Sequence, residues 1–246
     1  MHVETLVVSM FATNCYLVSC PESKEGIVID PGAEGKRILH EIEKSGLKIC
    51  GIVNTHGHID HTGANGRLKE ALRVPLYFPE KDLEAYRNPG FKLGVLFGKP
   101  VPPDHLLKEG DQISFGREVL TVLETPGHTA GGISLYSSGL VFTGDTLFAG
   151  SIGRTDLAGG SYPVLIGSIK DKLMVLPPQT MVYPGHGPAT TIETEARSNP
   201  FLLSGKEGEY LIEGSQGHQK GGLQSRHSSA GSVPLMKYSA RPGSGQ

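Results

Sequence analysis

The chain has 246 residues, 37% of them hydrophobic, and a formal net charge of −2 at pH 7. This length fits one large domain or two small ones. The near-neutral charge excludes the strongly basic surface of a typical nucleic-acid-binding protein, and no stretch reaches the roughly 18 apolar residues of a membrane-spanning helix. We therefore expect a protein that binds neither nucleic acid nor membrane, and no sequence feature specifies its oligomeric state.

Cysteine content and the N-terminal sequence both indicate a cytoplasmic protein. Cys15, Cys20 and Cys50 are an odd number without disulfide or zinc-ligand spacing, which predicts small buried thiols in a reducing compartment. The N-terminus carries no basic leader before an apolar segment, so we expect no signal peptide.

Short apolar runs alternate with helical patterns in the first half of the chain. The turn signal Asp30-Pro31-Gly32 closes a strand. Ile38 and Ile42 recur at helical spacing before Gly46, a typical helix stop. The predicted elements are strands 14–18 and 26–29, helix 35–45, strand 49–53, helix 64–72 and strand 75–78.

Residues 86–108 are rich in proline and glycine and show no regular period. Long irregular loops are often lids or binding loops. Tyr86, Phe91 and Phe97 could therefore face a substrate, and an ordinary surface crossover is the alternative.

The second half predicts two strand pairs, then a long helix and a last strand. These are strands 112–115, 118–123, 132–136 and 139–143, helix 162–176 and strand 181–183. In the helix, one face carries the apolar residues Leu165, Ile169, Leu173 and Leu176. Strands that alternate with helices indicate the α/β class, in which sites usually lie at the carboxyl ends of strands.

From residue 204 onward, glycine and serine dominate and no apolar period remains. Such a composition cannot bury enough apolar surface to order itself. We expect a folded domain over residues 1–203, and over 204–246 a disordered tail or an extension foreign to the fold.

Three histidines and an aspartate lie within residues 56–61, just after the predicted strand 49–53. His56 and His58 are two apart, so in an extended segment both side chains project to the same side and can bind one metal ion. Asp60 and His61 follow where the chain turns towards a helix, so they can face a second ion. Imidazole and carboxylate suit zinc, iron or manganese.

Three further candidates, His128, Asp145 and His186, each follow a predicted strand beside a glycine. Each alone is weak evidence, because a histidine or aspartate in a turn is usually structural. Together with the first cluster they predict one metal site built from distant parts of the chain.

This pattern resembles the motif set of the metallo-β-lactamase superfamily: Thr55-His56-Gly57-His58-Ile59-Asp60-His61, then His128, Asp145 and His186. The resemblance covers about residues 3–202 and implies a four-layer αββα sandwich with metals at one edge of its sheets. His61 and the runs at 144–148 and 153–156 are similar to the compact glyoxalase II-like branch, whose members hydrolyse thioesters such as S-lactoylglutathione.

The resemblance also implies a role for each candidate. The first ion would be held by His56, His58 and His128, the second by Asp60, His61 and His186, with Asp145 bridging both. The ions would be zinc, with iron or manganese as alternatives, and would activate the water that attacks a small acyl-thiol substrate. Asp60 would also orient this water and handle its proton, which makes it the candidate catalytic residue.

Three more residues are candidates for support of the site. Asp30 could orient a ligand histidine or cap a turn. Arg154 and Asp156 could form a buried pair that props the site, or a surface salt bridge.

The substrate is open at this point. Full-length glyoxalase II enzymes carry a C-terminal helical region that contacts glutathione, where this chain has only its Gly/Ser-rich tail. The alternatives are a mononuclear iron persulfide dioxygenase, which shares the Gly-Arg-Thr-Asp run, a lactone or β-lactam hydrolase of the same fold, and a non-enzymatic metal-binding protein. A ligand set of histidine and aspartate without cysteine favours open, catalytic coordination over a structural zinc site.

Overall fold

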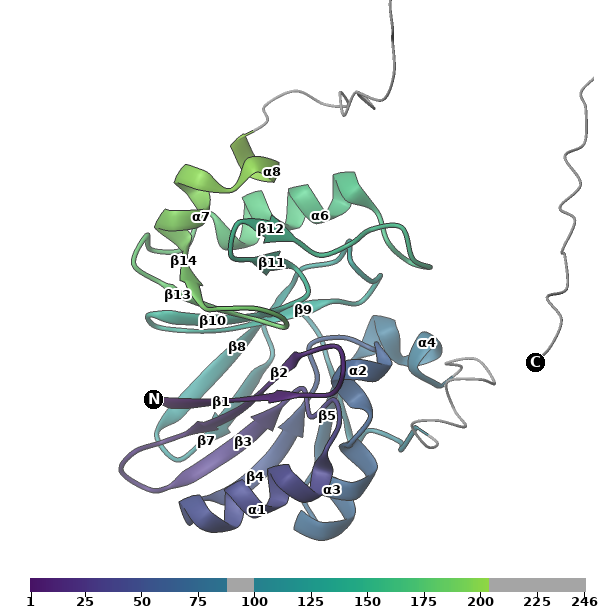
Figure 1. Ribbon diagram of the computed structural model, residues 1–246, viewed down its shortest axis with the longest axis vertical. Coiled ribbons are helices and arrows are strands. Elements are labelled where there is room, and N and C mark those ends of the chain that lie inside the picture. Colours follow the sequence, from purple (N-terminus) through teal and green to yellow (C-terminus); the bar gives the residue numbers. More distant parts are fainter. Residues whose placement is uncertain (88–99, 204–246) are drawn as a thin grey trace, which may run out of the picture. The chain divides into compact units, whose positions relative to one another are not determined.

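Two six-stranded β-sheets lie face to face, and helices cover the outer face of each (Figure 1). The computed structural model describes residues 1–87 and 100–203. The predicted αββα sandwich is confirmed within them. The expected tail, 204–246, lies outside the described residues, as do Phe91 and Phe97.

The first sheet has the strand order β1-β2-β3-β4-β5-β6, antiparallel from β1 to β3 and parallel from β3 to β6. Its strands are β1 (His2–Val8), β2 (Thr13–Ser19), β3 (Glu25–Ile29), β4 (Lys48–Val53), β5 (Leu76–Pro79) and β6 (His105–Leu107). Parallel β3, β4 and β5 end at the same edge, so the turns that follow them meet there.

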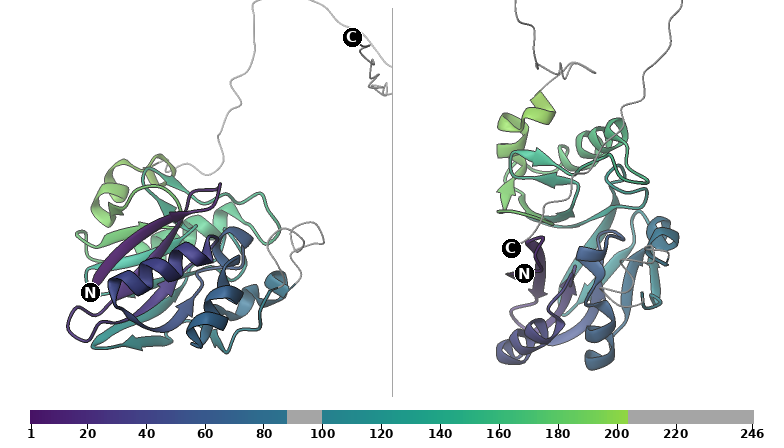
Figure 2. Two further views of the ribbon diagram at one scale, coloured as in Figure 1. Left: turned by 60° about the horizontal axis from the view of Figure 1, so that its bottom comes forward. Right: turned by 45° about the vertical axis from the view of Figure 1, so that its right-hand side comes forward.

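Two helices cover the outer face of the first sheet, α1 (Gly35–Ser45) and α3 (Asn65–Leu72). Figure 2 shows α1 crossing that face. Ile38 and Ile42 are buried against the sheet, as their helical spacing predicted, and Leu68 of α3 packs in the same cluster. Shorter pieces lie between the strands: α2 (Ile59–Thr62), η1 (Glu80–Asp82) and α4 (Leu83–Arg87).

The second sheet has the order β14-β13-β10-β9-β8-β7. Its strands are β7 (Gln112–Phe115), β8 (Glu118–Glu124), β9 (Ile133–Ser137), β10 (Leu140–Gly144), β13 (Met181–Pro184) and β14 (Thr190–Thr191). A two-stranded hairpin, β11 (Leu147–Phe148) and β12 (Ser151–Ile152), follows β10. The parallel pairing of β10 with β13 brings the ends of these two strands together.

The outer face of the second sheet is covered by α6 (Tyr162–Ser168), the π-helical turn η2 (Ile169–Leu173), α7 (Ile192–Ser198) and α8 (Pro200–Leu203). The helix predicted over 162–176 is therefore an α-helix that widens into one π turn and ends at Leu173. Leu165, Ile169 and Leu173 are fully buried as predicted, and Leu176 packs partly buried beyond the helix.

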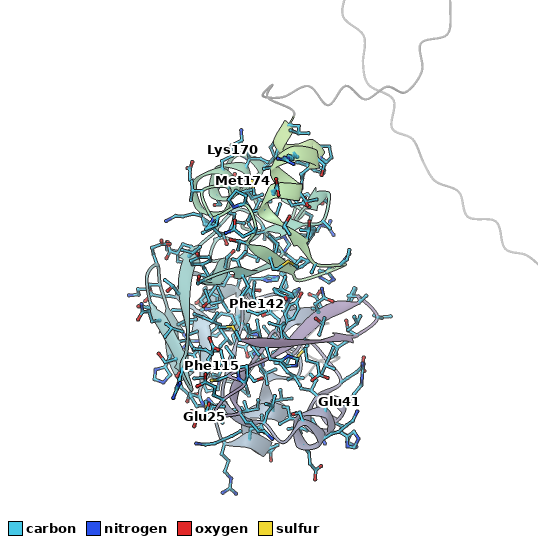
Figure 3. The ribbon with its side chains drawn as sticks, turned by 90° about the vertical axis from the view of Figure 1, so that its left-hand side faces the viewer. Glu25, Glu41, Phe115, Phe142, Lys170 and Met174 are labelled. Carbon is cyan, nitrogen blue, oxygen red and sulfur yellow. The ribbon has the colours of Figure 1, made fainter. Side chains whose placement is uncertain are left out.

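The main core lies between the sheets. Phe142 and Phe115 point into it, whereas Lys170 lies on the outer helical layer (Figure 3). At the site edge, the side chains of Asn14 and Tyr16 on β2 both donate to the carbonyl oxygen of Pro184, at 2.9 and 2.6 Å. The N-terminal hairpin thereby joins the end of β13 in the other sheet.

All three cysteines are free thiols; Cys15 and Cys20 are buried as predicted, whereas Cys50 is partly exposed. Among the described helices, none has the length and apolar character needed to cross a bilayer.

Candidate metal centre

All seven predicted ligand side chains meet where both sheets end. The first sheet contributes the segment after β4, in which His58 precedes the one-turn helix α2 that carries Asp60 and His61. The second sheet contributes the residues that follow β8, β10 and β13. The seven residues are His56, His58, Asp60, His61, His128, Asp145 and His186.

Three imidazoles form a first group. Nδ1 of His58 lies 3.1 Å from Nε2 of His56 and 2.9 Å from Nε2 of His128. His56 and His128 are buried and His58 is partly exposed. Three nitrogens that converge this closely form a set of the kind that binds a divalent metal ion.

A second group contains Asp60, His61 and His186. The Nε2 atoms of the two histidines lie 3.3 Å apart. Oδ2 of Asp60 lies 3.4 Å from Nε2 of His186 and 3.6 Å from Nε2 of His61. This group offers one carboxylate oxygen and two imidazole nitrogens.

Asp145 lies between the two groups. Its Oδ1 is 3.4 Å from Nε2 of His61, and its Oδ2 is 3.4 Å from Nε2 of His128. Oδ1 is buried and has no hydrogen-bond partner. A buried carboxylate oxygen without a partner is costly, and a cation shared by the two groups would satisfy it.

The outer nitrogens of the histidines determine which way their lone pairs point. Nδ1 of His128 donates to the carbonyl oxygen of Arg154 at 2.8 Å, and Nδ1 of His186 to that of Phe11 at 3.1 Å. A carbonyl oxygen only accepts, so each Nδ1 carries the hydrogen and the lone pair of Nε2 points inward.

His56 is oriented in the same way through Thr55. The Thr55 hydroxyl donates to Oδ2 of Asp30 at 2.6 Å, so it accepts from Nδ1 of His56, at 3.1 Å. Nδ1 of His61 donates to the same Asp30 oxygen at 3.0 Å. The facing lone pairs would repel one another without a positive charge between them, so the donor set fits bound cations.

The electrostatics of the two groups differ. Burial and the neighbouring imidazoles of His61 and His128 hold the pKa of His56 well below its usual range. Burial also lowers the pKa of His61, but the carboxylates of Asp145 and Asp30 outweigh it and raise this pKa to about 9. The carboxylates around His61 therefore favour a positive charge on its ring, whereas the surroundings of His56 disfavour one.

Asp30 orients a ligand histidine, which is one of the two roles predicted for it. It is buried, it adopts a left-handed backbone conformation (φ 50°) that aspartate tolerates, and its Oδ1 accepts the backbone N–H of Thr55 at 2.8 Å. Its carboxylate therefore fixes both His61 and the segment that leads to His56.

Of the two readings of Arg154 and Asp156, the buried pair is wrong and the surface salt bridge is confirmed. The two side chains do pair, at 2.7 and 2.8 Å, but they are 60% and 68% exposed. Residues two apart in an extended loop project to the same side, and here that side faces solvent. Arg154 contacts the site instead through its backbone carbonyl, which accepts from His128.

Sequence reasoning missed Asp82, a buried residue whose carboxylate contacts the turns on either side of the first group. It stands among exposed and apolar residues without a motif, so no local signal could identify it. Thr55 is part of the histidine motif, but the motif does not indicate that its hydroxyl connects His56 to Asp30.

A cleft of about 800 Å³ opens over the two groups, a size that suits a small molecule. Its described lining is largely apolar, with Phe11, Ile59, Phe148 and Leu157, and Arg154 lies at its wall. Tyr86 does not face it, because this residue is buried in α4 and its hydroxyl bonds to the carbonyl oxygen of Val101.

Comparison with known proteins gives one family for most of the chain. A family model described as the Metallo-beta-lactamase superfamily matches residues 9–186. The chain is 37% identical to hydroxyacylglutathione hydrolase GloC of Haemophilus influenzae over 211 residues, which cover 83% of this chain and 99% of that protein.

Solved structures agree with this match. TTHA1623 in a di-iron-bound form is 40% identical, with a TM-score of 0.74 over 81% of this chain and 100% of that chain. BLEG-1, a B3 metallo-β-lactamase, is 34% identical, with a TM-score of 0.76 over 82% of this chain and 100% of that chain.

Proposed function

The chain belongs to the metallo-β-lactamase superfamily, and on that premise we propose that it is a two-metal hydrolase of thioesters of the S-lactoylglutathione type. The observation that carries the proposal is the pair of complete donor groups with Asp145 between them. Asp60, His61 and His186 converge as a second donor group, which favours two bound ions over the one iron of the persulfide dioxygenase alternative.

We propose the following roles for these side chains. The first ion would be held by His56, His58 and His128, the second by Asp60, His61 and His186, and both by Asp145. Two ions held in this way supply a water of lowered pKa and polarise a carbonyl oxygen. Zinc suits the donors, and iron is the alternative that the di-iron form of TTHA1623 supports.

Asp60 would orient the attacking water and accept its proton. Its carboxylate lines the cleft, and the Thr13 hydroxyl donates to its Oδ2 at 3.3 Å, which limits its rotation. The leaving thiolate is stable enough to depart without a general acid, so no further proton donor is required.

The proposed acyl-thiol finds support in the relative from Haemophilus influenzae. The match covers 99% of that protein. The relative that carries the name hydroxyacylglutathione hydrolase therefore has no large region outside the part that it shares with this chain. A separate C-terminal helical region is therefore not a requirement for the proposed activity. The apolar cleft wall would accept the uncharged parts of the substrate.

The free thiols support a cytoplasmic location.

One experiment tests the proposal against its alternatives. Protein purified without chelators is analysed for metal content, then assayed for thiol release from S-lactoylglutathione, oxygen uptake with glutathione persulfide, and cleavage of a chromogenic β-lactam. We expect two ions per chain and thiol release. One iron per chain with oxygen uptake would contradict the proposal, and so would β-lactam cleavage without thioester hydrolysis.

A further inference from the structure

A buried carboxylate outside both donor groups contacts the two turns that carry the first one. Asp82 ends η1, directly after β5, and is 2% exposed. Its Oδ1 accepts the backbone N–H of Gly131 at 2.6 Å, and its Oδ2 accepts that of Gly57 at 2.9 Å. One side chain thus bridges two segments from different sheets.

Both contacted glycines are next to the histidines of the first group. Gly57 lies between His56 and His58, and Gly131 is in the same turn as His128. The distances between these three imidazoles therefore depend on how the two turns are held apart. We infer that Asp82 is a positioning residue, which holds the His56–His58 turn and the His128 turn at the separation that the first metal ion requires.

Asp82 is not itself a ligand in this arrangement. Among the described residues, no converging set of three donor atoms includes it, and each of its oxygens is occupied by a backbone N–H. Hydrogen bonds to a carboxylate are shorter and about twice as strong as neutral ones. The neighbouring Lys81 pairs with Glu124, and the contacts of the Asp82 carboxylate within the described residues are the two backbone N–H groups.

The close packing at Gly131 indicates that the contact between Asp82 and the His128 turn is fixed by the surrounding structure and is not a chance contact. A Cβ atom there would lie 2.4 Å from the backbone nitrogen of Asp82 and 2.7 Å from its Oδ1. Only glycine allows the His128 turn to approach η1 this closely. The backbone of Gly131 therefore packs directly against both the backbone and the carboxylate of Asp82.

The second group has a corresponding support. Asp30 accepts from Thr55 and from Nδ1 of His61, so it orients a ligand directly. Asp82 acts one step further out, through backbone groups, and its effect is expected on the first group alone. The inference rests on the proposed two-metal function, because positioning is defined here by metal affinity.

Isothermal titration calorimetry with zinc tests the inference without any substrate. The variants are Asp82→Ala and Asp82→Asn, and His58→Ala identifies which binding step belongs to the first group. We expect Asp82→Ala to weaken that step about 10–100-fold, the usual effect of removing an outer support, and to leave the other step unchanged. Asp82→Asn keeps one acceptor and a similar shape, so its loss should be smaller.

A matched control separates positioning from folding. Glu195 is also buried, and it also accepts a backbone N–H, from Gly150 at 2.9 Å, but in α7. Glu195→Gln should lower the unfolding temperature and leave both zinc affinities unchanged. The absorption spectrum of Co²⁺ bound to each variant reports whether the first group keeps its geometry.

The outcomes distinguish two failures. Wild-type protein that binds fewer than two ions would overturn the proposed function. Wild-type protein that binds two, with Asp82→Asn and Asp82→Ala matching it at both steps, would overturn only the positioning role. Equal weakening of both steps would also overturn it, because that result indicates a general loss of structure.

Discussion

At the scale of single residues, the imidazoles of the site are oriented from outside the donor groups. Carbonyl oxygens hold Nδ1 of His128 and His186, and Asp30 holds that of His61. Each contact selects one tautomer and one ring orientation. These outer contacts therefore point the Nε2 lone pairs of His128, His186 and His61 towards the donor groups.

Asp60 provides the sharpest test at this scale. Asp60→Ala removes an oxygen of the second group and the proposed proton acceptor, so we expect kcat to fall about 10²–10⁴-fold and one ion per chain to be lost. Thiol-release kinetics and metal analysis measure both. Asp156→Ala is the control, because its carboxylate lies in solvent and its loss should leave the metal content unchanged. Unchanged turnover in Asp60→Ala would refute its role.

Single residues also show what a sequence can predict. The seven donors could be found because histidines and aspartates at strand ends have no common structural explanation in such numbers. Asp82 could not, because its role depends on two backbone N–H groups that are remote in sequence. The sequence left open whether Arg154 and Asp156 form a buried or a surface pair. Their spacing indicates that both side chains face the same way, but not whether other residues cover that side.

At the scale of elements, α6 determines the position of the turn that carries His128. The backbone N–H of Ser161 donates to the carbonyl oxygen of Gly127 at 2.7 Å, and the Ser168 hydroxyl to that of Pro126 at 2.7 Å. A Cβ on Gly127, where φ is 128°, would lie 2.3 Å from the nitrogen of Leu165. The helix and the turn therefore pack backbone to backbone.

Gly127→Ala should separate the helix from this turn. We expect a loss of about 2–4 kcal/mol in the free energy of unfolding and weaker binding of the first ion, measured by denaturant titration and zinc calorimetry. Gly139→Ala is the control: Gly139 also has a positive φ, 87°, but no atom lies within 4 Å of its Cβ position. An equal zinc affinity in Gly127→Ala and wild type would contradict the expected effect.

Helix α1 has a pattern clear enough to be predicted. Ile38 and Ile42 are one helical turn apart on the buried face, and Gly46 adopts the left-handed conformation of a helix stop. Strands of two or three residues, such as β6, β11, β12 and β14, are too short to show alternation. They exist through pairing with a partner strand, which the pattern within each short strand does not contain.

At the scale of the whole site-bearing region, each sheet contributes part of both donor groups. The first group combines His56 and His58 from one sheet with His128 from the other, and the second combines His61 with His186. An ion bound in either group would therefore link the two sheets. Its binding free energy would add to the stability of the folded state.

Metal removal tests this link. Zinc at 100 times its dissociation constant stabilises the folded state by about 2.7 kcal/mol, which for a chain of this size raises the unfolding temperature by about 5–10 °C. Differential scanning calorimetry of chelated and zinc-loaded protein measures the difference. An unfolding temperature that does not respond to zinc would show that neither group binds across the sheets.

The proposed domain boundary can be tested by truncation. Every donor and every residue of the three described cores lies before residue 204. A chain that ends at Leu203 should keep its metal content, its unfolding temperature and its thiol release. Loss of any of the three would assign a role to residues 204–246.

The order of the donors along the chain also has a consequence for biosynthesis. The first group is complete once His128 has left the ribosome, but the second has to wait for His186 at the end of β13. At ordinary translation speed this delay lasts several seconds. A nascent chain that stops before His186 would therefore lack one donor of the second group.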